Sequence, residues 1–204
     1  MKVGAAVRRG PKPKPDTRSN LIRAGLQIIH AEGYSATGIQ SIVEGADIPK
    51  GSFYNHFASK EEFGTHVIAA YSDRGRGNLR DFLCNPDLAP LARLEAYFEH
   101  RIEVLRASNY ARGCLLGNFS AEAADHSELI RKSLVKHFDA WTDVIETCIS
   151  EAQDQGALGD QFSAATLAGF ILNSWEGALL RARVEKSDAP LVEFKDAIFG
   201  KLLT

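Results

Sequence analysis

The chain has 204 residues, of which 45% are hydrophobic and 25% are charged, so one large or two smaller domains can bury a substantial core. No apolar run approaches the roughly 20 residues of a membrane-spanning helix, and the basic N-terminus lacks the apolar segment of a secretory signal. The cysteines, Cys84, Cys114 and Cys148, are widely spaced, which argues against a disulfide framework or a zinc site. We therefore expect a cytoplasmic protein without a membrane partner, a metal or a cofactor.

The charge is unevenly distributed along the chain. Residues 1–60 carry nine basic and four acidic side chains, whereas the remainder carries 15 basic and 22 acidic ones. Such asymmetry indicates an N-terminal segment that meets a polyanion and a body that does not.

Residues 1–15 are predicted to form an extended basic arm, because prolines alternate with lysines near their end and exclude a helix. Two interpretations stay open. The arm is either a disordered tail or a segment whose Arg9 enters the minor groove of DNA.

From Asp16 the apolar residues follow helical spacing, and Gly33 is a natural end for this first helix. Thr37 and Gln40 then match a T-x-x-Q capping box, which predicts a second, short helix. In such a capping box the side chains of Thr37 and Gln40, three positions apart, can each accept a hydrogen bond from the backbone N–H of the other residue.

The stretch 46–60 combines a turn, a short helix and the beginning of another helix. Asp47 can adopt the left-handed backbone of a tight turn, and Pro49 presets the first turn of a helix. Phe53 and Phe57 are four residues apart, so they share the face that packs on a core and leave the polar side chains facing outward. Ser59 with Glu62 matches a second capping box.

The helix that begins at Ser59 contains Gly75 and Gly77, each of which costs about 1 kcal/mol relative to alanine. This weak segment is either locally irregular or a hinge between two modules. Further helices are predicted over 91–107 and 114–124, after a cap formed by Asp125 with Glu128, from a cap at Ser163 to 185, and from 190. No segment shows a strand pattern. The fold class is therefore all-α.

The T-x-x-Q cap and the run of residues 50–62, K-G-S-F-Y-N-H-F-A-S-K-E-E, closely resemble the DNA-binding domain of the TetR/AcrR family of transcriptional regulators. The resemblance covers about residues 16–67. It departs from the family pattern at Asp47, where a turn glycine is usual, and at Pro49, where a small capping residue is common. The resemblance implies a homodimer with a flexible arm at 1–15, a helix-turn-helix domain at 16–62 and a helical effector-binding and dimerisation domain at 63–204.

The resemblance also implies that the helix 49–57 is the recognition helix, and which residues meet DNA. Phosphate-contacting positions are Thr37, Lys50, Tyr54, His56 and Lys60, base-facing positions are Ser52 and Asn55, and Gly51 lies between them. Asn55 suits adenine best, and two such helices in a dimer imply a palindromic operator with half-sites about 34–36 Å apart. As an alternative, Tyr54 and His56 pack against the first helix as ordinary half-buried residues.

In the C-terminal part, residues 112–122 are similar to a string found in an electrophile- and acrylate-responsive subgroup of this family. Cys114 lies at a predicted helix start beside Arg112, and both features lower the pKa of a thiol. It is therefore either a sensor of electrophiles or a small buried hydrophobe. A pocket for a reversible effector, such as a small unsaturated acid, has as candidates Tyr97, Phe98, Arg101, Phe119, His137, Trp141, Asn173 and Trp175, although each also fits an ordinary core.

Small residues repeat at a spacing of four along the helix 163–185, namely Ala165, Gly169, Asn173 and Gly177. This row predicts close approach of the same helix of a second subunit, with Phe194 and Ile198 from the last helix completing the contact. Packing of the row within one subunit is the alternative.

The sequence thus favours a ligand- or electrophile-responsive transcriptional regulator, expected to be a repressor, that releases its operator when a small effector binds. A constitutive DNA-binding protein without an effector is the main alternative. An enzyme built on the Cys114 thiol is disfavoured, because the histidines show no catalytic or ligand spacing around it.

Overall fold

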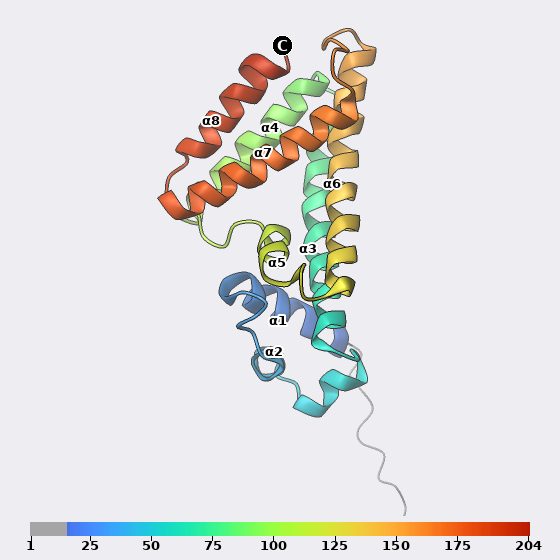
Figure 1. Cartoon of the computed structure of the whole chain (residues 1–204), viewed down its shortest axis with the longest axis vertical. Helices are drawn as coiled ribbons and strands as arrows, with labels where there is room; N and C mark the ends of the chain where they lie inside the picture. The colour runs from blue at the N-terminus through green and yellow to red at the C-terminus, as the bar shows by residue number, and fades with distance from the viewer. Residues whose placement is uncertain (1–15) are drawn as a thin grey trace, which may run out of the picture.

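The computed structural model describes residues 16–204, so the predicted arm and Arg9 lie outside the described part. All regular secondary structure in that part is helical, which confirms the all-α prediction (Figure 1). In chain order the elements are α1 (Thr17–Glu32), α2 (Ile39–Gly45), the 3₁₀ segment η1 (Lys50–Asn55), α3 (Lys60–Leu83), α4 (Pro90–Ala107), α5 (Leu115–Ala123), α6 (Glu128–Asp154), α7 (Ala164–Glu185), α8 (Ala189–Ala197) and the π-helical turn η2 (Ile198–Leu202).

The helices α1 and α2, the segment η1 and the beginning of α3 form the lower end of the molecule in Figure 1. Their common core is aromatic, since the rings of Phe53, Phe57 and Phe63 contact one another at centroid distances of 4.9–5.4 Å. These three side chains are almost completely buried, and burial of each such ring contributes about 1.5–3 kcal/mol. The short elements of this domain are thus held by tertiary packing rather than by their own helix propensity.

The long helices α3 and α6 run side by side and connect this domain to the upper part of the molecule (Figure 1). They approach closely at Gly75, where an added Cβ would lie only 2.6 Å from Cζ2 of Trp141. The indole Nε1 of Trp141 donates to Oγ of Ser72 at 3.0 Å, which fixes the ring against α3. Since α3 continues from Lys60 to Leu83, Gly75 is a packing residue in an unbroken helix.

Serine side chains begin the longer helices. Oγ of Ser59 accepts from the backbone N–H of Glu62 at 3.1 Å, as predicted, although the carboxylate of Glu62 accepts from Ala58 rather than from Ser59 itself. Ser163 caps α7, as predicted. The predicted cap of α6 at Asp125 is wrong, because Ser127 occupies that position and accepts from the N–H of Ile130.

The short helix α5 lies between the lower domain and the bundle formed by α4, α6, α7 and α8 (Figure 1). Within residues 16–204 no helix is both long and apolar enough to cross a membrane.

Candidate nucleic-acid interface and effector site

The turn before η1 is built as the sequence predicts. Asp47 has a φ of 53°, in the left-handed region, and Pro49 has a φ of −59° immediately before the 3₁₀ segment. The backbone N–H of Ile48 donates to Val43 O at 2.9 Å, which folds the turn back onto α2. The predicted α-helix 49–57 is therefore shorter and more tightly wound than expected, since η1 spans only Lys50–Asn55.

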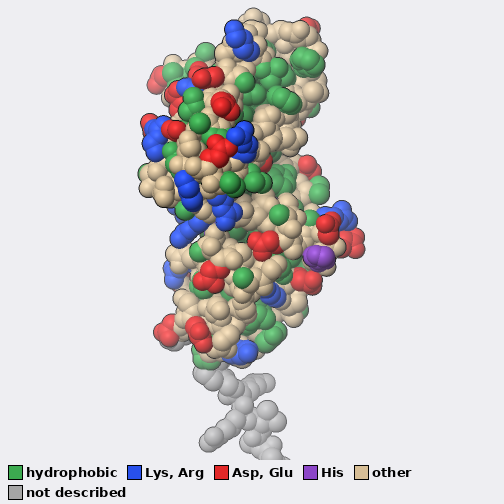
Figure 2. All heavy atoms as spheres, turned by 60° about the vertical axis from the view of Figure 1, so that its left-hand side comes forward, with side chains coloured by type: hydrophobic (Ala, Val, Ile, Leu, Met, Phe, Trp, Pro, Cys, Tyr) green, Lys and Arg blue, Asp and Glu red, His purple; other side chains and the backbone are tan. Residues whose placement is uncertain are grey.

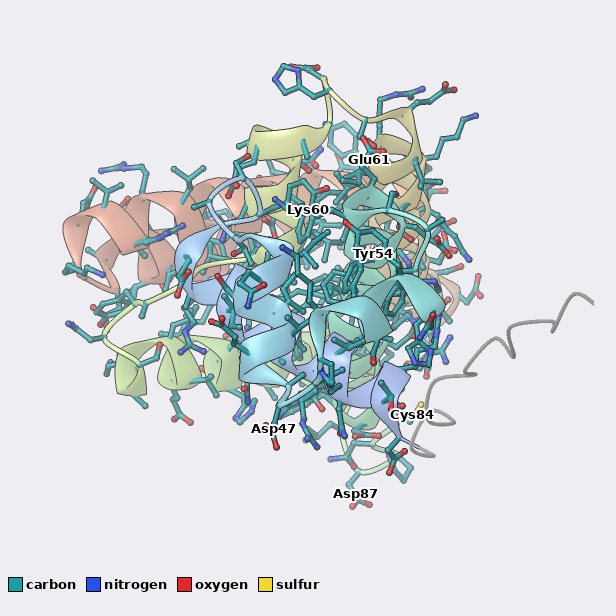
Figure 3. All side chains as sticks on the ribbon, turned by 90° about the horizontal axis from the view of Figure 1, so that it is seen from below. Asp47, Tyr54, Lys60, Glu61, Cys84 and Asp87 are labelled. Carbon is teal, nitrogen blue, oxygen red and sulfur yellow. The ribbon has the colours of Figure 1, made fainter. Side chains whose placement is uncertain are left out.

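Phe53 and Phe57 anchor η1, with 0% and 1% of their surfaces exposed. Because this face is fixed inward, the opposite face of η1 lies at the surface. It presents Lys50, Gly51 and Asn55 as exposed residues, Tyr54 with 57% of its surface exposed, and the half-buried Ser52. Figure 3 looks onto this end of the molecule and labels Asp47, Tyr54 and Lys60 around it.

Three of the predicted phosphate-contacting residues point partly or wholly inward. Thr37 is 1% exposed and its hydroxyl donates to Gly33 O at 2.7 Å. Nζ of Lys60 donates to Tyr34 O at 2.7 Å and lies 4.4 Å from the centre of the Tyr34 ring. His56 is half-buried, and its Nε2 is enclosed without a hydrogen-bond partner among the described residues. The packing alternative thus fits His56 but not Tyr54.

The predicted T-x-x-Q capping box is also wrong. Gly38, with extended backbone, precedes the first residue of α2 and no side chain caps that helix. The Thr37 hydroxyl is already used by Gly33, and Nε2 of Gln40 donates instead to Glu44 at 2.6 Å.

Two family models match the chain: bacterial regulatory proteins of the tetR family over residues 21–64, and the tetracyclin repressor-like C-terminal domain over residues 90–198. The chain belongs to the TetR family. It is 37% identical to the transcriptional repressor DhaR of Mycobacterium sp. strain GP1, covering 91% of this chain and 92% of DhaR. It is 36% identical to the transcriptional regulator AcuR of Cereibacter sphaeroides, covering 92% and 87% respectively. The crystal structure of a regulatory protein TetR from Rhodobacter sphaeroides superposes with a TM-score of 0.84 at 34% identity, covering 93% of this chain and all of that one. These relatives are transcriptional regulators rather than enzymes.

In this TetR-family protein most of the predicted effector residues belong to the packed core. The ring of Phe98 contacts those of Trp175 and Phe194 at 5.0 and 5.1 Å, and all three are buried. Phe119 packs instead against Tyr34 of the DNA-binding domain at 4.9 Å. The remaining candidates are also dispersed: Trp141 is bonded to Ser72, and Asn173 is exposed on α7. His137 is buried on α6, and its Nδ1 has no hydrogen-bond partner within residues 16–204.

A second group of side chains does converge. Tyr97, Arg101 and Cys114, all predicted, share an electrostatic environment with Tyr71 and Glu176, which the sequence did not single out. Burial raises the pKa values of both tyrosines and of the Glu176 carboxyl, while the positive charge of Arg101 opposes each of these shifts. Oε1 of Glu176 is enclosed without a hydrogen-bond partner among the described residues. At neutral pH the two phenols are hydrogen-bond donors, and Arg101 supplies the positive charge among them.

A cavity of about 360 Å³ opens beside this polar group, between the C-terminal end of α1 and the helices α5 and α7. Cys114 and Glu176 belong to its wall, together with His30, Glu122 and Arg183. His30 is fixed by a hydrogen bond between its Nε2 and Gly113 O at 3.0 Å. The volume suits a small molecule, and a ligand bound there would contact both domains.

Of the two interpretations of Cys114, the small buried hydrophobe fits the structure and the acidic thiol does not. The residue is 6% exposed, and burial together with the neighbouring Glu176 carboxylate raises the pKa of the thiol well above its ordinary value. Backbone N–H groups at the start of α5 lower it less than burial raises it. Cys148 is buried, with its Sγ 3.0 Å from Pro90 O, whereas Cys84 is exposed.

The row of small residues on α7 faces outward. Ala165, Asn173 and Gly177 are exposed, and a Cβ added at Gly169 or Gly177 would meet nothing within 4 Å. This row adjoins a groove between α5, α6 and α7. The prediction that Phe194 and Ile198 complete this contact is wrong, since both side chains are buried within the subunit.

Proposed function

We propose that this TetR-family regulator is a repressor that binds a palindromic operator as a homodimer and releases it when a small effector binds the C-terminal domain. The observation that carries the proposal is the polar face of η1, fixed outward by Phe53 and Phe57. The similarity to the repressor DhaR supports the direction of control.

The side chains of this face divide by chemistry. Lys50 and Tyr54 suit phosphate oxygens, since an ammonium and a phenol position a protein on DNA without reading its sequence. Asn55 suits adenine, whose N6 and N7 match the donor and acceptor of an amide. Thr37, His56 and Lys60 hold the shape of this surface in the free protein, while Arg9 stays a proposed minor-groove contact.

DNA selection from a random pool, followed by titration of the purified protein with the selected duplex, tests this division. Asn55→Ala is expected to relax the preference at one position of each half-site, at a cost of about 1–3 kcal/mol for the preferred base. Lys50→Ala is expected to weaken binding to all sequences and to reduce the dependence of log affinity on log salt by about one unit. Lys132→Ala on α6 is the matched control because its side chain is exposed in the other domain. A wild-type protein that selects no sequence refutes the proposal.

The outward row on α7 supports a dimer contact. Next to the small residues, Phe170, Leu180 and Val184 expose large apolar side chains on the same helix. Hydrophobic patches are visible on the upper domain in Figure 2. Large side chains next to small residues on one helix favour packing against a second copy of that helix, related by a two-fold axis.

Sedimentation of two glutamate variants tests this contact. Leu180→Glu is expected to dissociate the dimer, because it places a charge on the apolar row. Val104→Glu on α4, at another exposed apolar position, is expected to leave it intact. Equal sedimentation of both variants and the wild type as dimers would show that the contact lies elsewhere.

For the effector we propose a small carboxylate that pairs with Arg101 and accepts hydrogen bonds from Tyr71 and Tyr97. The raised pKa values of the two phenols support this, since they stay protonated donors. Acrylate is expected to release the operator from the wild type but not from Arg101→Met, and N-ethylmaleimide in place of acrylate tests the thiol route through Cys114. If neither compound changes operator affinity, the constitutive alternative gains support.

A further inference from the structure

We propose that Glu122 on α5 is the positioning residue through which the effector domain holds the operator-binding segment. This inference rests on the proposed function, since it concerns how effector control reaches η1. It assigns the transmission to α5, in addition to the longer helix α3 that joins the two domains.

The carboxylate of Glu122 fits the turn between α1 and α2 closely. Its Oε2 accepts the backbone N–H of Ser35 at 2.8 Å, across 87 positions of the chain. Gly33 has a φ of 94°, and a Cβ built there would lie 2.9 Å from Oε1 of Glu122. The carboxylate therefore occupies space that is open only because residue 33 has no side chain, so a bulkier residue at position 33 would displace it.

The same turn is held from two sides. From within the DNA-binding domain, Nζ of Lys60 donates to Tyr34 O at 2.7 Å. From the effector domain come the Glu122 bond to Ser35 and the ring of Phe119, 4.9 Å from that of Tyr34. The turn leads directly into α2, and α2 is bonded to the segment before η1 through Ile48. A movement of α5 is thus carried to the face that meets DNA.

The other end of α5 lies in the polar group that we propose as the effector site. Cys114 precedes the first residue of α5, and its thiol neighbours the carboxylate of Glu176 on α7 in the same cavity wall. The nine residues of α5 span about 13.5 Å at 1.5 Å each, and Glu122 lies near the opposite end of the helix from Cys114. The cavity of about 360 Å³ extends along this helix, since both Cys114 and Glu122 line it. A ligand that separates α5 from α7 would therefore change the position of Glu122.

The partial exposure of this bond suits a coupling role. Glu122 is half-buried and Ser35 is exposed, so water can replace the hydrogen bond when it breaks. Burial lowers the pKa of Lys60, and the negative charge of Glu122 partly opposes that shift, so Glu122 also stabilises the ammonium that holds the turn from the other side.

Hydrogen–deuterium exchange on the full-length dimer, with and without its selected operator duplex, tests the coupling. Because coupling between sites is reciprocal, operator binding by the wild type is expected to slow exchange in residues 115–123 at least about fivefold. Glu122→Ala is expected to bind the operator but to lose this protection, and to exchange the Ser35 amide faster even without DNA. Glu122→Gln retains an acceptor oxygen and is expected to restore part of the protection.

Lys60→Met is the matched control, since it removes the other hydrogen bond to the same turn from inside the DNA-binding domain. It is expected to weaken operator binding while the protection of 115–123 at saturating operator is retained. If operator binding protects residues 115–123 of Glu122→Ala as fully as those of the wild type, the proposed role is overturned. It is also overturned if Lys60→Met loses as much of this protection as Glu122→Ala does. A protein that selects no operator refutes the proposed function itself and is recognised before the variants are compared.

Discussion

Substitution of alanine for Gly75 and for Gly77 is expected to have opposite effects on stability. Both residues lie inside α3, where alanine in place of glycine stabilises a helix by about 1 kcal/mol. At Gly77 a Cβ meets nothing within 4 Å, so Gly77→Ala is expected to raise the free energy of unfolding by that amount. At Gly75 the Cβ would lie 2.6 Å from Trp141, and such overpacking costs about 1–3 kcal/mol.

The displaced indole would also weaken its 3.0 Å hydrogen bond to Ser72, which contributes about 1 kcal/mol. Gly75→Ala is therefore expected to lose about 1–3 kcal/mol net, which places it about 2–4 kcal/mol below Gly77→Ala. Urea unfolding followed by far-ultraviolet circular dichroism, at one protein concentration for all variants, measures the difference. Equal stability of the two variants would refute the packing of Trp141 on Gly75. A destabilised Gly77→Ala would instead indicate that α3 needs flexibility at that position.

Ser59→Ala is expected to cost about 1 kcal/mol in unfolding free energy, because it removes the acceptor for the Glu62 N–H at the start of α3; thermal unfolding measures it. Iodoacetamide is expected to modify the exposed Cys84 well before Cys114, because burial raises the pKa of the Cys114 thiol. Peptide mass spectrometry measures the order of modification, and equal rates at the two cysteines would contradict the burial of Cys114. Burial lowers the pKa of His30 below its ordinary 6.5, so the unfolded chain binds a proton there more readily than the folded one. The contribution of His30 to the free energy of unfolding is therefore complete above about pH 6.5 and decreases on acidification. His30→Gln is expected to lose less stability than the wild type between about pH 7.5 and 5.5, as measured by urea unfolding.

The turn before η1, the buried face of η1 and the cap of α3 could be predicted because their determinants are local. The i, i+4 spacing of Phe53 and Phe57 fixes which face is buried, and that burial is observed. Asp47 adopts the predicted left-handed turn, and Ser59 caps α3 as expected. Each of these features depends on residues no more than four positions apart, so a local pattern in the sequence could indicate it. The equally local T-x-x-Q pattern failed because Gly33 O takes the Thr37 hydroxyl.

The orientation of the polar residues could not be predicted in the same way. Lys60 is bonded to a carbonyl 26 positions away, and this competing partner turns its ammonium inward. Glu122 is bonded to a turn 87 positions away. Helical periodicity does not distinguish residues of the core from residues that line a cavity. Phe98 and Trp175 therefore were candidates for a pocket, whereas their ring contact shows that they belong to the core. An available signal was Glu176, a single acidic residue between buried apolar positions of α7.

Cys114 illustrates how a local rule is overruled by distant residues. The helix start and the adjacent Arg112 predict a thiol of low pKa, yet Arg112 is exposed with a φ of 70°, and the group that faces the thiol is Glu176, 62 positions further along. The thiolate is the reactive form of cysteine, so an electrophile can attack Cys114 rapidly only after α5 has separated from α7 and the thiol has left its carboxylate neighbour. On the coupling proposed above, that separation would also release Glu122 from Ser35. Separation of α5 from α7 would then have two consequences: it would expose Cys114 to modification and break the Glu122 bond to the α1–α2 turn. Covalent modification of Cys114 would keep the two helices apart.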